Sequence, residues 1–143
     1  MIRPYVIFAF LLIIFCLPAC QSANNGNSDN LKLTEKKWVL FRLNKQEIEK
    51  SQYSGEKPYV IFNTNANEFS GHGGCNKIFG TYHTGHDTLQ FLGIASTKMF
   101  CGDENIETKF LQTLKRGITF LIEANSLHIY DSTKTEILEF KPA

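Results

Sequence analysis

Short stretches rich in aromatic and β-branched residues recur along the chain, and turn-forming residues separate each stretch from the next. Stretches at this spacing are typical of antiparallel sheets and barrels, because these side chains pack well on a pleated surface. The alternation of Phe120 and Ile122 with Thr119 and Glu123 places one face of its segment toward a core. The predicted strands cover residues 38–43, 59–63, 78–82, 88–91, 94–97, 119–123, 127–130 and 137–140.

One segment departs from this two-residue alternation. Ile106, Phe110 and Leu114 recur at the spacing of a helical face. The carboxylates at the start of the segment, Glu107 among them, complement a helix dipole, which explains them without an acid–base role. We therefore expect one α-helix, from about Asp103 to Lys115. The predicted fold class is α+β with mainly β content: a curved antiparallel sheet or open barrel closed by one helix.

The first nineteen residues have the pattern of a secretory signal. Arg3 precedes an apolar run over residues 5–17, which is too short to span a bilayer. The run leads into Leu-Pro-Ala-Cys at 17–20, which resembles the lipobox of bacterial lipoproteins. We expect residues 1–19 to be a lipoprotein signal peptide and Cys20 to carry the lipid that holds the protein to a membrane. The alternatives are an ordinary cleaved signal and a short uncleaved anchor.

The residues after Cys20 indicate the membrane to which the protein is sorted and a flexible tether. In the lipoprotein sorting pattern Asp after the cysteine favours the inner membrane, so Gln21 indicates the outer membrane of the bacterial cell envelope. Residues 21–30 contain no aromatic or large aliphatic side chain, so we expect 20–30 to be a flexible tether. Residues 31–143 then form one domain.

The charge of the chain is nearly balanced. Fifteen Lys and Arg residues oppose fourteen Asp and Glu residues, which gives a net charge of +1. Nucleic-acid-binding domains usually carry a basic excess or stripe. We therefore expect no nucleic-acid partner.

Cys75 and Cys101 are the thiols left in the domain once Cys20 is acylated, and an extracytoplasmic compartment favours their oxidation. The first hypothesis is a disulfide between them. A second hypothesis gathers both cysteines with His72 and His83 into a tetrahedral metal site, for which the ligand types fit but the spacing is irregular. A third makes Cys75 a catalytic nucleophile, which an oxidising compartment disfavours. The prediction is a disulfide, with no metal, cofactor or catalytic residue.

The densest local pattern is a glycine-rich run. Gly71, Gly73 and Gly74 stand within four residues, directly before Cys75 and Asn76. The run lacks the spacing and the Ser or Thr of a phosphate-binding P-loop, so we expect a tight, bulged β-connection.

The order of these motifs resembles the META domain, the HslJ-like family of small bacterial envelope proteins. The resemblance covers about residues 31–141. Its motifs are Trp38-x-Leu40, the strand 58–62, the glycine-cysteine-asparagine block with Gly80 and Tyr82, the block 95–101 with Thr97, Met99 and Cys101, the helix 107–114 and a closing hairpin. Lys98 stands where Arg is frequent in the family, and Phe100 stands where a small residue is usual.

The resemblance implies a compact, mainly antiparallel β fold with one helix, often displayed as a lipoprotein. It implies a link to heat or envelope stress in some members, and it does not imply an enzyme. Asn76 is expected to hydrogen-bond the backbone of the glycine loop, and Thr97 to satisfy a buried strand group. Structural roles are implied for Gly71, Gly73, Gly74, Asn76, Gly80 and Thr97.

The leading functional hypothesis is a non-catalytic, lipid-anchored envelope protein that binds a protein or an apolar ligand and contributes to stress tolerance. Its partners are the membrane, through Cys20, and that protein or ligand. An alternative is an inhibitor of an extracytoplasmic hydrolase, with a protruding loop within residues 44–57. An alternative of another class is a metal carrier or thiol enzyme that uses Cys75 with His72 or His83.

Overall fold

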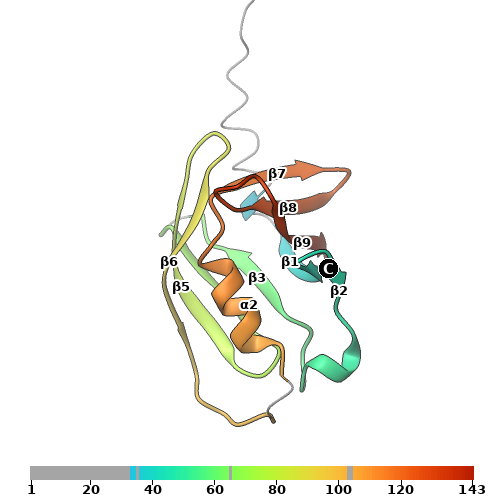
Figure 1. Cartoon of the computed structure of the whole chain (residues 1–143). Coiled ribbons are helices and arrows are strands. Elements are labelled where there is room, and N and C mark those ends of the chain that lie inside the picture. The colour runs from blue at the N-terminus through green and yellow to red at the C-terminus, as the bar shows by residue number, and fades with distance from the viewer. Residues whose placement is uncertain (1–32, 35, 65, 103–104) are drawn as a thin grey trace, which may run out of the picture.

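The computed structural model describes residues 33–34, 36–64, 66–102 and 105–143 (Figure 1). The predicted signal peptide, Cys20 and the tether lie outside the described residues. No helix among the described residues is long and apolar enough to cross a membrane. The elements in chain order are β1 (Lys37–Leu43), β2 (Gln46–Glu47), the 3-10 helix η1 (Lys50–Gln52), β3 (Tyr59–Phe62), β4 (Glu68–His72), β5 (Lys77–Thr84), β6 (Leu89–Ser96), α2 (Glu107–Leu114), β7 (Thr119–Glu123), β8 (Ser126–Tyr130) and β9 (Glu136–Pro142).

The strands form one antiparallel sheet that curls into a half-barrel. Its order is β6-β5-β4-β3-β1-β9-β8-β7, and β2 pairs with the end of β1. The two edge strands approach each other at a bridge between Thr88 and Thr119, where the Leu89 N–H also donates to the Ile118 carbonyl at 3.0 Å. Away from this bridge the edges diverge, and α2 lies on the concave side of the sheet (Figure 1). The predicted α+β class, mainly β with a curved sheet closed by one helix, is confirmed.

The core fills the space between the concave face and the helix. Phe110 of α2 packs edge-on against Phe140 of β9, with ring centroids 6.2 Å apart. Trp38 of β1 is fully buried, and its indole N–H donates to the Leu33 carbonyl at 2.8 Å. Burying one such large apolar side chain stabilises a domain by roughly 1.5–3 kcal/mol. These contacts join the helix and the chain before β1 to the middle of the sheet.

Two strand predictions need correction. The segments 88–91 and 94–97 belong to one strand, β6, which contains a bulge that interrupts the sequence pattern. At the bulge Gly93 adopts φ +56°, and the β5–β6 register shifts between Phe79 and Thr81. Strand β4 is missing from the prediction, because Ser70 and Gly71 have little β propensity and the glycine run indicates a loop. Its pairing with β3 and β5 overrides that local signal.

The helix is shorter than predicted. It begins at Glu107 and not at Asp103, and it ends at Leu114. Asp103, where the predicted helix begins, and Glu104 lie outside the described residues. Asn105 caps the first turn instead, since its Oδ1 accepts the Glu107 N–H at 2.9 Å.

Candidate functional site

The glycine-cysteine-asparagine block meets the segment that follows β6. Residues 73–76 form the turn between β4 and β5, and the Gly73 N–H donates to the Asn76 carbonyl at 2.8 Å. A disulfide joins Cys75 of this turn to Cys101, with Cα atoms 5.9 Å apart. The structure therefore brings the predicted cysteine pair together. Across a separation of 26 residues, such a cross-link stabilises a domain by about 3.5 kcal/mol in the chain-entropy picture.

Asn76 lies buried at the centre of this contact. Its side-chain NH₂ donates to Glu107 Oε1 at 3.0 Å and to the Met99 carbonyl at 3.2 Å. Its side-chain oxygen accepts the Met99 N–H at 2.7 Å and the Thr97 hydroxyl at 2.9 Å. Every hydrogen-bonding position of the amide is used, as burial requires. The side chain thus holds the segment after β6 and not the glycine loop as expected. The Thr97 hydroxyl donates to Asn76, and the Thr97 N–H donates to the Lys77 carbonyl of β5 at 3.1 Å.

Glu107 closes the other side of the contact from the first turn of α2. Its Oε2 accepts the backbone N–H of Asn76 at 2.6 Å. A Cβ on Gly73 would lie 2.6 Å from the same oxygen, so glycine at this position lets the carboxylate approach. The sequence explains Glu107 by the helix dipole alone. The contact with Asn76 is a second role that only the tertiary fold reveals.

The other predicted glycines have separate places. Gly74 adopts φ +105° in the turn, a conformation that favours glycine. Gly71 lies within β4, paired with β3 and β5. Gly80 lies in β5 opposite Phe69, outside the contact around Asn76.

The residues that make this contact are named together below as the Asn76 clamp: Cys75, Asn76, Thr97, Met99, Cys101 and Glu107.

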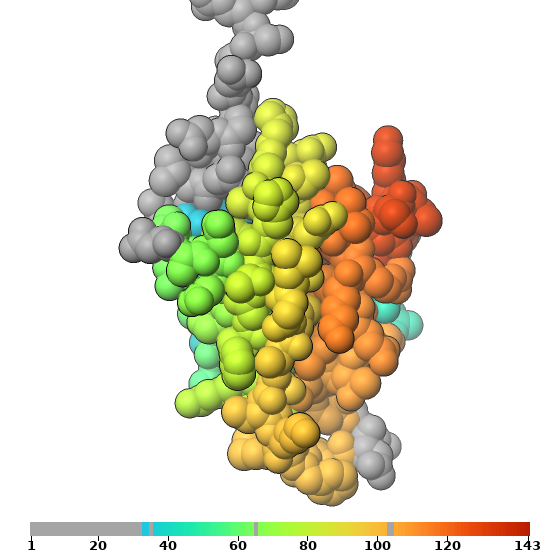
Figure 2. Space-filling view, turned by 90° about the vertical axis from the view of Figure 1, so that its left-hand side faces the viewer, coloured from blue at the N-terminus to red at the C-terminus, as the bar shows by residue number. Residues whose placement is uncertain are grey.

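The clamp holds a loop that carries two exposed apolar side chains. Met99 is 62% exposed and Phe100 is 86% exposed. The backbone is fixed on both sides of Phe100, by Asn76 at Met99 and by the disulfide at Cys101. Residues 97–102, which we call the clamped loop, form the lower end of the molecule in Figure 2. A polar recess of about 250 Å³ lies beside the two side chains.

The sequence singles out the motif residues of the clamp but not this exposed pair. The sequence did contain one indication of this exposed pair, because Phe100 stands where a small residue is usual in the family. Apolar side chains scattered singly on a surface are ordinary, whereas a contiguous exposed apolar patch marks a contact surface. Met99 and Phe100 are neighbours on one loop, so they form such a contiguous pair.

The histidines of the hypothetical metal site do not meet the cysteines. His72 Nδ1 accepts the Gly74 N–H at 3.1 Å, and its ring stacks on Tyr59. His83 is exposed on β5 opposite Gln90, roughly 20 Å along the strand from the Cys75 turn. Both cysteine sulfurs are bonded to each other. The arrangement assembles neither the four-residue metal site nor a free thiol beside a histidine.

A different group of potential ligands lies on β8 and β9, which the sequence does not indicate. Ligand atoms of His128, Glu136 and Glu139 lie within 4.8 Å of one another. His128 Nδ1 is 3.0 Å from Glu136 Oε2, and Arg42 of β1 donates to Glu139 at 3.0 Å. The His128–Glu136 contact and the Arg42–Glu139 ion pair account for the group as a polar network across neighbouring strands.

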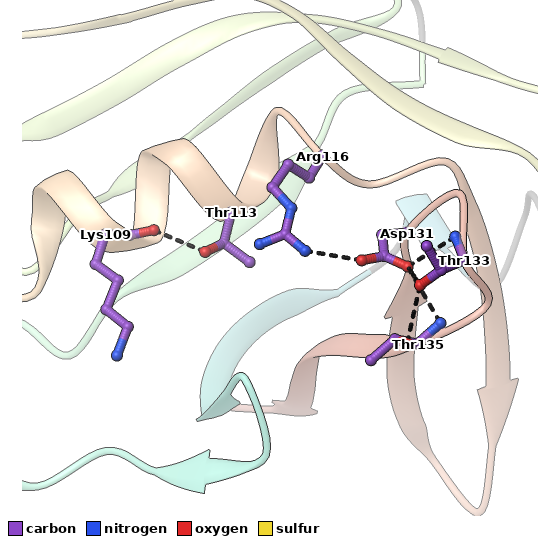
Figure 3. Close-up of polar contacts among 6 residues, drawn as sticks. All are labelled: Lys109, Thr113, Arg116, Asp131, Thr133 and Thr135. Atoms are coloured by element: carbon purple, nitrogen blue, oxygen red, sulfur yellow. Dashed lines mark hydrogen bonds and ion pairs between the residues drawn. The ribbon is translucent and has the colours of Figure 1, made fainter.

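Asp131 orders the turn between β8 and β9 (Figure 3). Arg116, just beyond α2, donates to its Oδ2 at 2.7 Å, and the Thr133 hydroxyl donates to its Oδ1 at 2.6 Å. The Thr133 and Thr135 N–H groups donate to the same Oδ1 at 3.0 and 3.2 Å. The pKa of Asp131 is lowered from 3.8 to about 2, mainly by the hydrogen bond from the Thr133 hydroxyl. Partial burial of the carboxyl group opposes this shift, and the hydrogen bonds from Arg116 and the backbone N–H groups add to it.

Comparisons with known proteins agree with this fold. A solution NMR structure shares it at a TM-score of 0.61 and 22% identity, covering 78% of this chain and 92% of that one. An NMR structure of a protein from Burkholderia xenovorans has a TM-score of 0.62 at 21% identity, covering 83% and 88%. A crystal structure of a DUF4847 family protein from Bacteroides vulgatus has a TM-score of 0.51 at 17% identity, covering 76% and 93%.

At these identities the solved structures show a shared fold and nothing about activity. No curated protein matches the sequence. The sequence profile of the META domain matches residues 31–143, which include every described element. The chain therefore belongs to the META domain family.

Proposed function

We propose that the chain is a non-catalytic, lipid-anchored protein of the bacterial cell envelope, whose META domain binds another protein through the clamped loop. The observation that carries this proposal is the exposure of Met99 and Phe100 on a fixed backbone. A partner that covers them gains apolar contact and orders little new chain, because the disulfide and Asn76 already hold the loop. Phe is also common at the centre of protein interfaces.

The interior supports surface binding over an enclosed apolar ligand. Trp38, Phe110 and Leu114 are fully buried where sheet and helix meet. The recess beside Ile48 and Ile106 holds about 10 Å³. That volume is room for about one water, whereas small-ligand sites measure hundreds of cubic ångströms.

The lipid anchor and the outer-membrane location are proposed from the sequence. A lipid on Cys20 and a tether over residues 20–30 would leave the domain free to meet a partner near the membrane. Gln21 supports the outer membrane. A role in heat or envelope stress is supported by the resemblance to members of the family.

The clamped loop is a better contact element than the segment that an inhibitor would insert. Residues 44–57 fold back on the domain: Ile48 is buried, and the Ser54 N–H donates to the Gly74 carbonyl at 2.8 Å. We therefore assign partner contact to Phe100, for a hydrolase target as for an assembly partner.

Site-specific photo-crosslinking in intact cells tests the proposal. A photoreactive phenylalanine analogue at position 100 should give a discrete protein adduct, with or without heat stress. The same analogue at Leu121, which is 47% exposed on β7, is the matched control and should give none. The Met99→Ala variant should weaken the adduct at position 100, because it removes one of the two exposed apolar side chains. Equal adducts at the two positions, or none at position 100, would contradict the proposal.

A further inference from the structure

A pocket lies where two turns meet at one end of the sheet. The Asn44 N–H of the β1–β2 turn donates to the Ile137 carbonyl at 2.8 Å, and Tyr130, just before the β8–β9 turn, pairs with Glu136. Both turns therefore flank the start of β9. The pocket measures about 550 Å³ and is lined by Arg42, Lys45, Tyr130, Lys134, Thr135 and Glu136.

The cations of this pocket are only partly neutralised. Lys45 and Lys134 have no ion pair with any residue that the structure describes. Arg42 uses one guanidinium nitrogen on Glu139, and its side chain is 45% exposed, so further N–H donors face solvent. The carboxylate in the lining, Glu136, lies 3.0 Å from His128 Nδ1. Unpaired ammonium groups at a concave surface attract anions.

Both lysines occupy backbone positions that favour glycine. Lys45 adopts φ +67° and Lys134 adopts φ +61°, the left-handed region that strains residues with a side chain. In the described part of the chain, the other non-glycine residues with positive φ are Asn44, Asn67, Ala124 and Asn125. Asparagine tolerates this region, whereas lysine has no conformational reason to be there. Two separate turns thus hold a lysine against local preference, and both lysines line one pocket, which points to a function for their charge.

The turn that carries Lys134 is fixed before any ligand arrives. Asp131 binds the Thr133 and Thr135 N–H groups (Figure 3). The Lys134 N–H donates to the Asp131 carbonyl at 2.9 Å. Burial, followed by Glu136 and Glu123, raises the pKa of Tyr130, so its phenol stays neutral. A pocket whose backbone is already ordered spends little binding free energy on rearrangement.

We propose that this pocket binds a ligand that carries phosphate groups, with Lys45 and Lys134 as its main charged contacts and Arg42 beside them. Lysine binds phosphate oxygens as a point charge, and arginine binds them through paired N–H groups. The volume of about 550 Å³ exceeds the needs of one phosphate, so a diphosphate or a phospholipid headgroup is the size that fits. The proposal is independent of the protein contact at Phe100.

The test is a titration of the full chain in non-ionic detergent micelles, followed by amide chemical shifts in NMR spectra. One arm uses inorganic pyrophosphate, and the other uses phosphatidylglycerol in mixed micelles. We expect the amides of Lys45, Lys134 and Thr135 to shift and saturate below about 10 mM probe. Shifts with pyrophosphate alone assign a soluble ligand, and shifts with both probes or with the lipid alone assign a headgroup. No shift with either probe overturns the proposal.

Glycine substitutions separate binding from folding. Lys45→Gly and Lys134→Gly relieve the positive φ, so the Tm should hold or rise while affinity for the probe falls about two- to fivefold per lysine. Ala124→Gly is the matched control, because it relieves φ +47° in a turn that does not line the pocket, and its affinity should not change. Unchanged affinity in both lysine variants would also overturn the proposal.

Discussion

The Glu107 carboxylate binds Asn76 twice, accepting its backbone N–H at 2.6 Å and its side-chain NH₂ at 3.0 Å. The two residues belong to different parts of the chain, the first turn of α2 and the turn between β4 and β5. This pair therefore fixes the helix against the sheet. Because Asn76 also holds both backbone groups of Met99, one side chain connects the helix, the hairpin and the clamped loop.

The first prediction concerns Asn76. Asn76→Ala leaves the Met99 N–H and part of the Glu107 carboxylate without partners, so the free energy of unfolding should fall by about 2–3 kcal/mol. Amide hydrogen exchange at Met99 should accelerate in the same variant. The exposed helix residue Gln112, replaced by Ala, is the control and should change stability by less than about 0.5 kcal/mol. Wild-type stability in Asn76→Ala would contradict the role of the clamp.

The disulfide gives a second prediction. A non-reducing digest should recover the peptides of Cys75 and Cys101 joined, and the double variant Cys75→Ala/Cys101→Ala should lose about 3.5 kcal/mol of unfolding free energy. Urea denaturation with and without a reductant measures the loss. The reductant should change the wild-type midpoint and leave that of the double variant where it is. Recovery of both peptides as free thiols would refute the bond.

The third prediction is a pH dependence from Asp131. Its pKa is lowered from 3.8 to about 2 in the folded protein, so its ionised form stabilises the fold. That stabilisation is fully present above the unfolded pKa and is lost as pH falls toward the folded pKa. The gap in urea midpoint between wild type and Asp131→Asn should therefore be wide at neutral pH and close between about pH 4 and pH 2. A gap independent of pH would show that the charge of Asp131 contributes nothing.

The proposed lipid anchor gives a fourth prediction. In the native host, labelled palmitate should enter the wild-type protein but not the Cys20→Ala variant, whose precursor should accumulate. Globomycin should produce the same precursor from the wild type, because it blocks cleavage of lipoprotein signals. The neighbouring variant Cys16→Ala is the control, since Cys16 lies within the apolar run and should be processed normally. Labelling that survives Cys20→Ala would remove the anchor from the proposal.

Local patterns were sufficient for the elements whose periodicity and turn residues lie within one short segment of the chain. The hairpin of β7 and β8 follows from the alternation of Phe120 and Ile122 and from the turn at Ala124 and Asn125, both at positive φ. The helix follows from the spacing of Phe110 and Leu114. Strand β4 could not be predicted in this way, because its pairing with β3 and β5 outweighs the poor β propensity of its own residues.

The site was predictable in its parts and not in its connections. Cysteine chemistry in an oxidising compartment suggested the bond between Cys75 and Cys101. The hydrogen bonds from Asn76 to Thr97 and Met99 depend on where β6 ends relative to the β4–β5 turn, and the register that sets this distance is a property of the whole sheet. The exposure of Phe100 has the same origin. It follows from a backbone held on both sides, which no local pattern encodes.

The position of β9 between β1 and β8 has a consequence for how the chain is made. Trp38 pairs with Val60 of β3 on one side and with Pro142 of β9 on the other, so β1 gains its second neighbour only when β9 has been synthesised. The long loop that this pairing must close is a slow step in folding, and the nascent chain exposes the apolar face of β1 until then. A stop codon ahead of Glu136 would therefore not trim an edge of the sheet. It would remove β9 from the middle of the sheet, so that β1 and β8 lose the strand between them and the two parts of the sheet meet at the edge bridge between Thr88 and Thr119.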